Sequence, residues 1–236
     1  MPEKKITIGL VEDRELVRTG VRSLINEWPE FEFIFESNQA FSAIKELRKQ
    51  NRPSPDVLLS DLYFPNNGEQ AYQGFELCLD LEKELPDIKV LIFSVDDSPA
   101  VQHKAIEMGA RGFLPKSCSP AELRNALIQI SEVGAYVNED SLKAIQKRLR
   151  SSATKKGKPQ KGTELSNREV EVLQLICQQL SAEEIGAKLF ISAKTVNGHR
   201  NNLLQKTGAR NITGLVMYAV HHGYVESLKY NPNFHS

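Results

Sequence analysis

Five residues whose side chains could carry out phosphoryl chemistry stand directly after short apolar runs of the sequence. They are three acids, one hydroxyl and one amine: Glu12, Asp13, Asp61, Ser94 and Lys116. Three carboxylates brought together repel one another, which raises their affinity for protons or demands a cation. Oxygen ligands suit Mg2+, and with this ion bound one carboxylate could attack phosphorus to form an aspartyl phosphate. Ser94 could then donate to a phosphoryl oxygen, and Lys116 could pair with another.

The segments around these residues predict a parallel sheet. Apolar runs bounded by turn residues alternate with helical patterns, at residues 6–11, 31–37, 57–61, 90–94 and 112–115. Alternation of this kind favours an α/β doubly wound five-stranded parallel sheet with helices on both faces. Ligand sites of such sheets lie beyond the carboxyl ends of the strands. All five residues fall at that edge.

A single acid at the end of a strand is usually part of the solvated surface. Five complementary residues at the ends of four strands are much harder to attribute to chance, so the sequence favours a functional site. Histidine and cysteine are not needed for this chemistry. The cysteines are widely separated and form no C-x-x-C pair, which indicates buried or idle thiols in a reducing compartment: Cys78, Cys118 and Cys177.

Size and composition indicate a globular protein of two domains. The chain has 236 residues, of which 40% are hydrophobic and 25% charged. No apolar run approaches the roughly 18 residues that span a bilayer. The N-terminal stretch MPEKKITIGL has no signal-peptide pattern. We therefore expect a cytoplasmic protein that does not enter a membrane.

A change of composition separates the two expected domains. SSATKKGKPQKG at 151–162 has no apolar periodicity and predicts an exposed linker, and the preceding residues 141–150 resemble a short helix. The expected boundaries are 1–135 for the α/β domain, 136–162 for the linker helix and flexible linker, and 163–236 for an all-α domain.

The pattern after the linker is purely helical. Ser166 with Glu169, and Ser181 with Glu184, form S-x-x-E capping boxes ahead of apolar helical patterns. A third helix is expected after Ser192, and a fourth over 212–222.

The zero net charge of the chain conceals an uneven distribution. Residues 1–150 contain 19 basic and 24 acidic side chains, whereas residues 188–210 contain five basic side chains and no acid. A basic segment in a small, nearly neutral domain is a candidate contact for phosphate backbones, although by itself it is more often a solvated face.

Four stretches of the first domain resemble the response-regulator receiver family: VEDRELVR at 11–18, LLSDLYFP at 58–65, LIFSVDDS at 91–98 and GFLPKSCSPAEL at 112–123. The resemblance covers nearly all of residues 5–135 and implies the flavodoxin-like receiver fold. It also implies roles for single residues. Asp61 would be the phosphoacceptor and Asp13 a direct Mg2+ ligand. Glu12 would contact the ion largely through metal-bound water, and the Tyr63 carbonyl would be the last Mg2+ ligand that the protein supplies.

The same resemblance implies the parts of a switch, with three departures from the family pattern. Ser94 would be the switch hydroxyl, Phe113 the aromatic that changes rotamer, and Lys116 a partner of the phosphoryl group. The glycine that opens the third helix is expected at Gly74, which leaves an enlarged loop at 65–73. Val95 replaces a small residue and would narrow access to the site. Phe113 lacks a hydroxyl, so its coupling to Ser94 would be steric.

Residues 163–226 resemble the LuxR/NarL-type helix-turn-helix domain, and SAKTVNGHRNNLLQKTG matches its recognition helix. Val196, Leu203 and Leu204 would face the core. The remaining side chains are the candidates for DNA contact: Lys194, Thr195, Asn197, His199, Arg200 and Lys206. Lys194 and Asn197 lie on the early turns of this helix, so they are favoured for contact with base edges. Thr195, Arg200 and Lys206 are expected to contact phosphates. A helical bundle that binds another protein is the alternative.

Together the two resemblances imply a NarL/FixJ-type transcriptional regulator rather than an enzyme. A partner histidine kinase, or a small phosphodonor, would phosphorylate Asp61, and the active form would be a homodimer on double-stranded promoter DNA. The first alternative is a phosphorylation-independent DNA-binding regulator whose receiver serves as a dimerisation module. The second is a phosphatase with Asp61 as nucleophile, but such enzymes usually carry a second acid where this chain has Tyr63.

Overall fold

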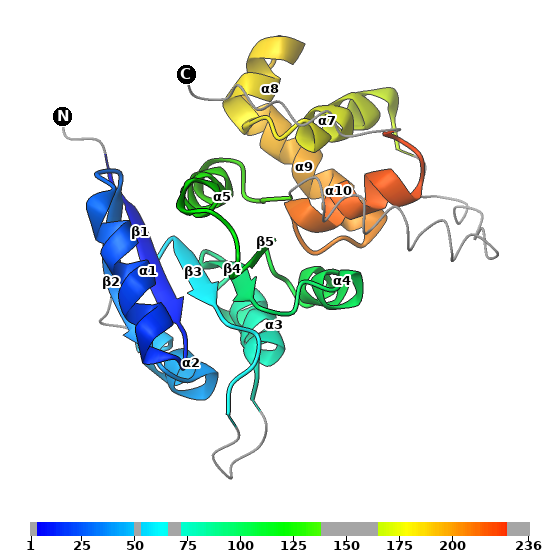
Figure 1. The fold of residues 1–236 in the computed structure, drawn as a ribbon. Helices are drawn as coiled ribbons and strands as arrows, with labels where there is room; N and C mark the ends of the chain where they lie inside the picture. Colours follow the sequence, from blue (N-terminus) through cyan, green and yellow to red (C-terminus); the bar gives the residue numbers. More distant parts are fainter. Residues whose placement is uncertain (1–3, 50–52, 66–71, 138–164, 226–236) are drawn as a thin grey trace. The chain divides into compact units, whose positions relative to one another are not determined.

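The computed structural model describes residues 4–49, 53–65, 72–137 and 165–225 (Figure 1). The chain forms two compact units that divide after Gly134, one residue before the boundary expected at 135. The expected linker at 151–162 and the helix at 141–150 lie outside the described residues. Within the described ranges, no helix combines the length and the apolar character that crossing a bilayer requires.

The first unit contains the predicted five-stranded parallel sheet, with strand order β2-β1-β3-β4-β5. The strands agree with the predicted runs to within one residue: β1 (Ile6–Val11), β2 (Phe31–Ser37), β3 (Val57–Ser60), β4 (Lys89–Ser94) and β5 (Gly112–Pro115). All four residues of β3 are buried, because helices cover both faces of the sheet. The prediction of an α/β doubly wound sheet is confirmed.

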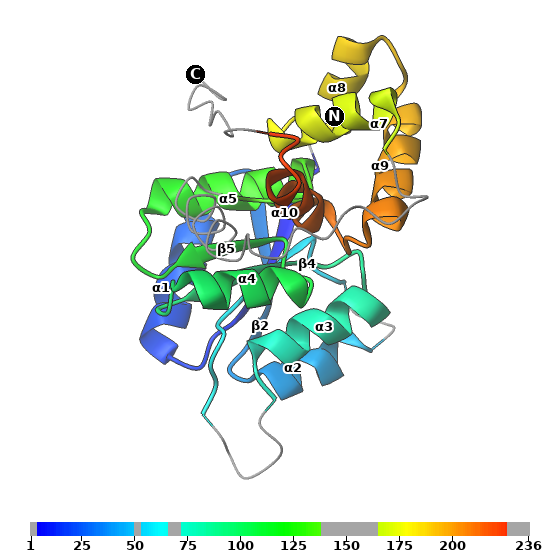
Figure 2. The same cartoon turned by 90° about the vertical axis from the view of Figure 1, so that its right-hand side faces the viewer.

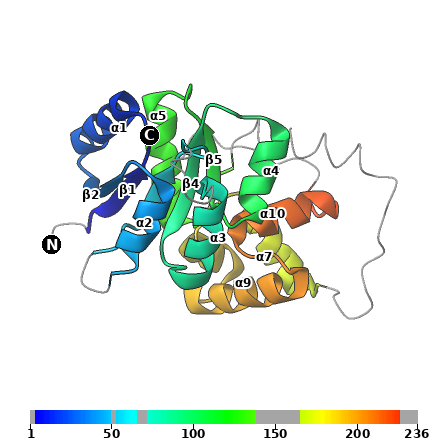
Figure 3. The same ribbon diagram turned by 90° about the horizontal axis from the view of Figure 1, so that it is seen from below.

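Four helices connect the strands and a fifth follows β5: α1 (Glu15–Glu27), α2 (Ala40–Leu47), α3 (Gly74–Glu84), α4 (Pro99–Glu107) and, after β5, α5 (Pro120–Glu132). Helices α2, α3 and α4 cover one face of the sheet, and α1 and α5 cover the other (Figures 2 and 3). Side chains of α2, α3 and α4 pack with one face of the strands into a single apolar cluster, which includes Ile44, Leu77 and Ala105. The strands are thereby fixed so that their carboxyl ends meet at one edge.

The described part of the second unit is all-α, as predicted. Its helices are α7 (Asn167–Cys177), α8 (Ala182–Leu189), α9 (Ala193–Thr207) and α10 (Ile212–His221). The hydroxyls of Ser166 and Ser181 cap α7 and α8 within the two predicted capping boxes, and Ser192 caps α9. Val196 and Leu203 are fully buried in the core of this unit, and Leu204 is partly buried against it.

Candidate functional site

The three acids predicted to act together meet at the carboxyl edge of the sheet. In the pairing of β1 with β3, Val11 lies opposite Ser60, so the residues that follow these two become neighbours. The Asp61 amide also donates to the Val11 carbonyl at 2.8 Å. As a result, one carboxylate oxygen from each of Glu12, Asp13 and Asp61 lies within 4.8 Å of the others.

Lys116 contacts two of these acids at once. It follows β5, and its amide donates to the Ser94 carbonyl at 2.8 Å, which fixes it beside the end of β4. Its Nζ lies 2.5 Å from Asp61 Oδ2 and 2.6 Å from Glu12 Oε2. The ammonium is itself largely buried, with 9% of its side chain exposed. The edge of the sheet therefore holds three carboxylates and one cation in a small volume.

The electrostatics of this acidic cluster favour an additional cation. Glu12 is fully buried, and this burial raises the pKa of its carboxyl above the ordinary value, while Lys116 lowers it in part and Asp61 adds repulsion. Among the residues that the structure describes, none donates a hydrogen bond to Asp13 Oδ1, which is buried. A divalent cation would satisfy this oxygen and offset the excess negative charge. The donor set, made only of oxygens, fits Mg2+.

The strand that carries the phosphoacceptor candidate is held close to helix α3. Gly74 opens this helix, as expected, and its amide donates to the Leu62 carbonyl at 2.9 Å. A Cβ atom at Gly74 would overlap the Asp61 carbonyl oxygen and lie 2.9 Å from Leu62 Cα. Only glycine permits this approach. Of the enlarged loop at 65–73, residues 66–71 lie outside the described part of the chain.

Ser94, Phe113 and Val95 occupy different environments. Ser94 is fully buried, and its hydroxyl accepts a hydrogen bond from the Asp96 amide at 3.3 Å. Phe113 is 3% exposed and packs in the apolar cluster beneath α3 and α4, so it is already turned inward. Val95 is 61% exposed and projects from the loop that follows β4. The Tyr63 hydroxyl donates to Asp96 at 3.4 Å and joins that loop to the loop after β3.

Two contacts of this region are not among the sequence predictions. Arg18 Nη1 donates to the Glu12 carbonyl at 2.8 Å, and the Gln73 side chain bonds the backbone of Phe64. Two features of the sequence could have indicated these contacts. Arg18 lies in the first turns of the helix that follows Glu12 and Asp13, and Gln73 directly precedes the glycine that opens the third helix.

The candidate DNA-contacting residues of α9 divide into exposed and inward-facing groups. Lys194, Thr195 and Asn197 are exposed on the first turns of the helix, and His199 is partly buried. Gly198 is exposed, and a Cβ atom there would meet no other atom within 4 Å. The free face of α9 therefore begins with the residues favoured for base contact.

Arg200 and Lys206 contact their own domain. Arg200 Nη2 donates to the Leu180 carbonyl at 3.2 Å, in the turn between α7 and α8. Lys206 Nζ lies 2.7 Å from Oε2 of the buried Glu169. Burial raises the pKa of Glu169, but hydrogen bonds from Lys206 and Ser166 outweigh it and hold that pKa below 4.5. Helical spacing explains why these two side chains contact their own domain. Arg200 is four residues after the buried Val196, and Lys206 is three residues after the buried Leu203, so each lies on the same side of α9 as a core residue.

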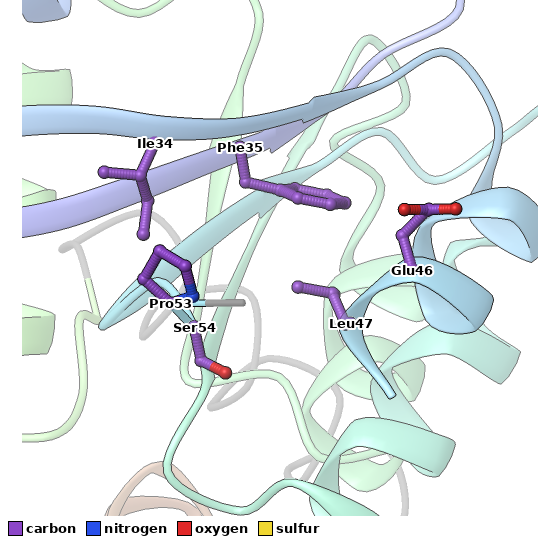
Figure 4. Close-up of a pocket in the computed structure, with 6 residues that line it drawn as sticks. All are labelled: Ile34, Phe35, Glu46, Leu47, Pro53 and Ser54. Atoms are coloured by element: carbon purple, nitrogen blue, oxygen red, sulfur yellow. The ribbon is translucent and has the colours of Figure 1, made fainter. Parts of the chain in front are cut away.

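A cavity of about 300 Å³ lies elsewhere in the first unit (Figure 4). Ile34 and Phe35 of β2 and Leu47 of α2 form its apolar wall, with Pro53 and Ser54 ahead of β3 and Glu46 as its charged residue. Because Pro53 and Ser54 precede β3 whereas Asp61 follows it, the cavity is separate from the acidic cluster.

Comparisons with known proteins cover both units. Residues 8–128 match the response regulator receiver domain, and residues 163–219 match the bacterial regulatory proteins of the luxR family. The chain is 31% identical to the transcriptional regulatory protein DegU of Brevibacillus brevis, with 95% of this chain and 97% of that protein aligned. It is 32% identical to the uncharacterized transcriptional regulatory protein YxjL of Bacillus subtilis, with 96% and 100% aligned.

A solved structure shares the fold across most of the chain. It is RcsB from Salmonella enterica serovar Typhimurium, bound to the promoter rprA in the presence of the phosphomimetic BeF3−. The TM-score is 0.53 at 21% sequence identity, and the alignment covers 92% of this chain and 100% of that one.

Proposed function

This chain belongs to the family of two-component response regulators that join a receiver domain to a LuxR-type DNA-binding domain, and we propose that phosphorylation of Asp61 switches its activity. Members of this family are transcriptional regulators rather than enzymes. We assign residues 1–135 to the receiver, 136–162 to the connecting segment and 163–236 to the DNA-binding domain.

The observation that carries the proposal is the complete acidic cluster. Asp61 lies within reach of two further carboxylates and of Lys116, all at the carboxyl edge of the sheet. In the proposed transfer, an Asp61 carboxylate oxygen forms a bond to phosphorus. The bond between phosphorus and the imidazole nitrogen of a kinase histidine breaks, and that nitrogen takes up a proton.

The residues proposed to hold Mg2+ are Asp13 and Asp61 directly, Glu12 largely through water, and Tyr63 through its carbonyl. The unpartnered Asp13 oxygen and the raised pKa of Glu12 support this assignment. A bound Mg2+ would neutralise the negative charge that gathers around the transferred group.

The switch is proposed to act through the loop after β4. A phosphoryl group on Asp61 would recruit the Ser94 hydroxyl, which now accepts from the Asp96 amide, and would compete for Lys116. Phe113 would fill the space beside β4 in the active form, and its side chain is already buried in this structure. Phosphorylation would thereby shift a pre-existing equilibrium of the surface around α4 and α5.

The output is proposed to be DNA binding by a homodimer in the cytoplasm. The exposed first turns of α9 carry Lys194, Thr195 and Asn197 toward the major groove. Arg200 and Lys206, which contact their own domain in the free protein, would have to leave these partners or share them to reach phosphates. Promoter DNA with two half-sites would match the two-fold symmetry of the dimer.

Intact-mass spectrometry after incubation with acetyl phosphate and Mg2+ tests the transfer. The wild-type protein is expected to gain one phosphoryl group, and Asp61→Asn none. Asp97→Asn, which removes an exposed carboxylate from the loop after β4, should be labelled like wild type. Labelling of Asp61→Asn at the wild-type level would refute Asp61 as the acceptor.

A further inference from the structure

One side chain at the start of α3 satisfies both backbone polar groups of Phe64. The Phe64 amide donates to Gln73 Oε1 at 2.6 Å, and Gln73 Nε2 donates to the Phe64 carbonyl at 3.1 Å. This paired contact joins two residues nine positions apart, at the two ends of the enlarged loop. The backbone just beyond Tyr63 is therefore held by a side chain that has no part in the acidic cluster.

The contact fixes the direction of the Tyr63 carbonyl. That carbonyl and the Phe64 N–H belong to the same planar trans peptide group, so they point in opposite directions. Because the Phe64 N–H points toward Gln73, the Tyr63 oxygen must point away from it. Within the described part of the chain, no backbone or side-chain donor bonds the Tyr63 carbonyl. Donation from the N–H of the same peptide also polarises the carbonyl and makes its oxygen a stronger ligand.

Gln73 is itself held by the amino-terminal turn of α3. The backbone amide of Gln73 donates to Glu76 Oε2 at 3.0 Å, and the backbone amide of Gly74 donates to the Leu62 carbonyl at 2.9 Å. The close approach of Gly74 to the Asp61 backbone leaves little freedom in this arrangement. Gln73 therefore connects the start of α3 to the peptide group that carries the Tyr63 carbonyl, and it holds that peptide group in a fixed position relative to the helix.

We propose that Gln73 is a positioning residue for the metal site: it orients the Tyr63 carbonyl so that this oxygen can bind Mg2+. The inference rests on the proposed function, because it takes that carbonyl as a ligand. Gln73 touches neither the metal nor the phosphoryl group and acts only through the Phe64 peptide.

The test is the Mg2+ dissociation constant of the full, unphosphorylated chain, measured by isothermal titration calorimetry. Gln73→Met keeps the length of the side chain but removes both hydrogen bonds to Phe64, together with the capping bond that the Gln73 side chain accepts from the Glu76 backbone amide. It should raise the dissociation constant on the order of 10-fold, as loss of a supporting contact around a metal ligand typically does. Gln73→Glu keeps an acceptor for the Phe64 N–H but loses the donor to the Phe64 carbonyl, so its dissociation constant should lie between those of wild type and Gln73→Met. Glu76→Ala weakens the start of α3 but leaves the Gln73–Phe64 pair, so its dissociation constant should rise much less than that of Gln73→Met.

The possible outcomes separate this inference from the proposed function. If wild type and Gln73→Met bind Mg2+ equally while Asp13→Asn does not bind, the metal site stands and the role of Gln73 is refuted. Equal weakening by Gln73→Met and Glu76→Ala would also refute it, because general loosening of α3 would then be sufficient. A wild-type protein that binds no Mg2+ would overturn both the metal site and the role of Gln73.

Discussion

The ammonium of Lys116 lies 2.5 Å from Asp61 Oδ2, and the same nitrogen lies 2.6 Å from Glu12 Oε2. One internal cation therefore contacts two of the three carboxylates that are proposed to surround Mg2+. Lys116 partly neutralises the cluster in the unphosphorylated protein, and it must share Asp61 with any incoming cation or phosphoryl group.

Replacement of Lys116 by glutamine should tighten Mg2+ binding. The variant removes a competing positive charge and leaves the carboxylates in place, so the dissociation constant should fall several-fold, about 1 kcal/mol of binding free energy for a charge contact of this kind. Titration calorimetry of the unphosphorylated chain measures this effect. Lys83→Gln, on the exposed side of α3, is the control and should match wild type. Weaker Mg2+ binding by Lys116→Gln would mean that the lysine supports the metal site rather than competes with it.

The stability of the receiver should depend on pH through Glu12. Burial raises the pKa of this carboxyl in the folded protein, so the folded state holds its proton at pH values where the unfolded chain has released it. Its contribution is therefore favourable below the unfolded value of about 4.5 and is lost as pH rises through the folded pKa. In metal-free buffer, Glu12→Gln should be more stable than wild type at pH 7.5, and this difference should shrink toward pH 4. Urea denaturation at both pH values measures it, and a less stable variant at pH 7.5 would contradict the account.

An alanine at position 74 should damage the receiver, whereas one at position 20 should not. The added Cβ at Gly74 would overlap the Asp61 carbonyl, and such overpacking typically costs about 1–3 kcal/mol. At Gly20, within α1, the added Cβ meets no other atom within 4 Å, so helix propensity should raise the stability by up to about 1 kcal/mol. Urea denaturation of the two variants provides the comparison. Equal stability of both would show that the close approach at Asp61 is not needed.

Two substitutions in α9 should have opposite signatures. Asn197 is exposed, so Asn197→Ala should leave unfolding unchanged and weaken binding to an operator by about 1–3 kcal/mol, with little effect on random DNA. Arg200 bonds the Leu180 carbonyl, so Arg200→Ala should lower the unfolding free energy of the helical domain. Chemical denaturation and fluorescence anisotropy on both DNA types measure the two quantities. The reverse pattern would place Arg200 at the bases and Asn197 in the fold.

The sheet and its acidic edge could be predicted because one physical rule links them. Strands buried on both faces are continuous apolar runs, of which VLLS at 57–60 is the clearest, and parallel strands end at the same edge. Residues after β1 and β3 must then meet, so Glu12, Asp13 and Asp61 were expected together. The capping boxes at Ser166 and Ser181 were equally predictable, since their contacts span only three residues.

The contacts that could not be predicted depend on side-chain direction between distant segments. Lys116 could have paired with any acid of the cluster, and only the fold shows that it contacts both Asp61 and Glu12. The Gln73 contact with Phe64 joins two residues nine positions apart, across a loop with no periodic pattern. The helical spacing from Val196 indicates that Arg200 lies beside the core, but only the fold shows that its partner is the Leu180 carbonyl.

Switching through Asp61 is tested by comparing wild type and Asp61→Ala in the presence of Mg2+, with and without beryllofluoride, which mimics the aspartyl phosphoryl group. Sedimentation mass and affinity for double-stranded DNA are measured in all four conditions. The mimic is expected to promote dimerisation or tighten DNA binding of wild type and to leave Asp61→Ala unchanged. Identical behaviour of both proteins in every condition would contradict this expectation, and would favour a regulator whose receiver acts only as a dimerisation module.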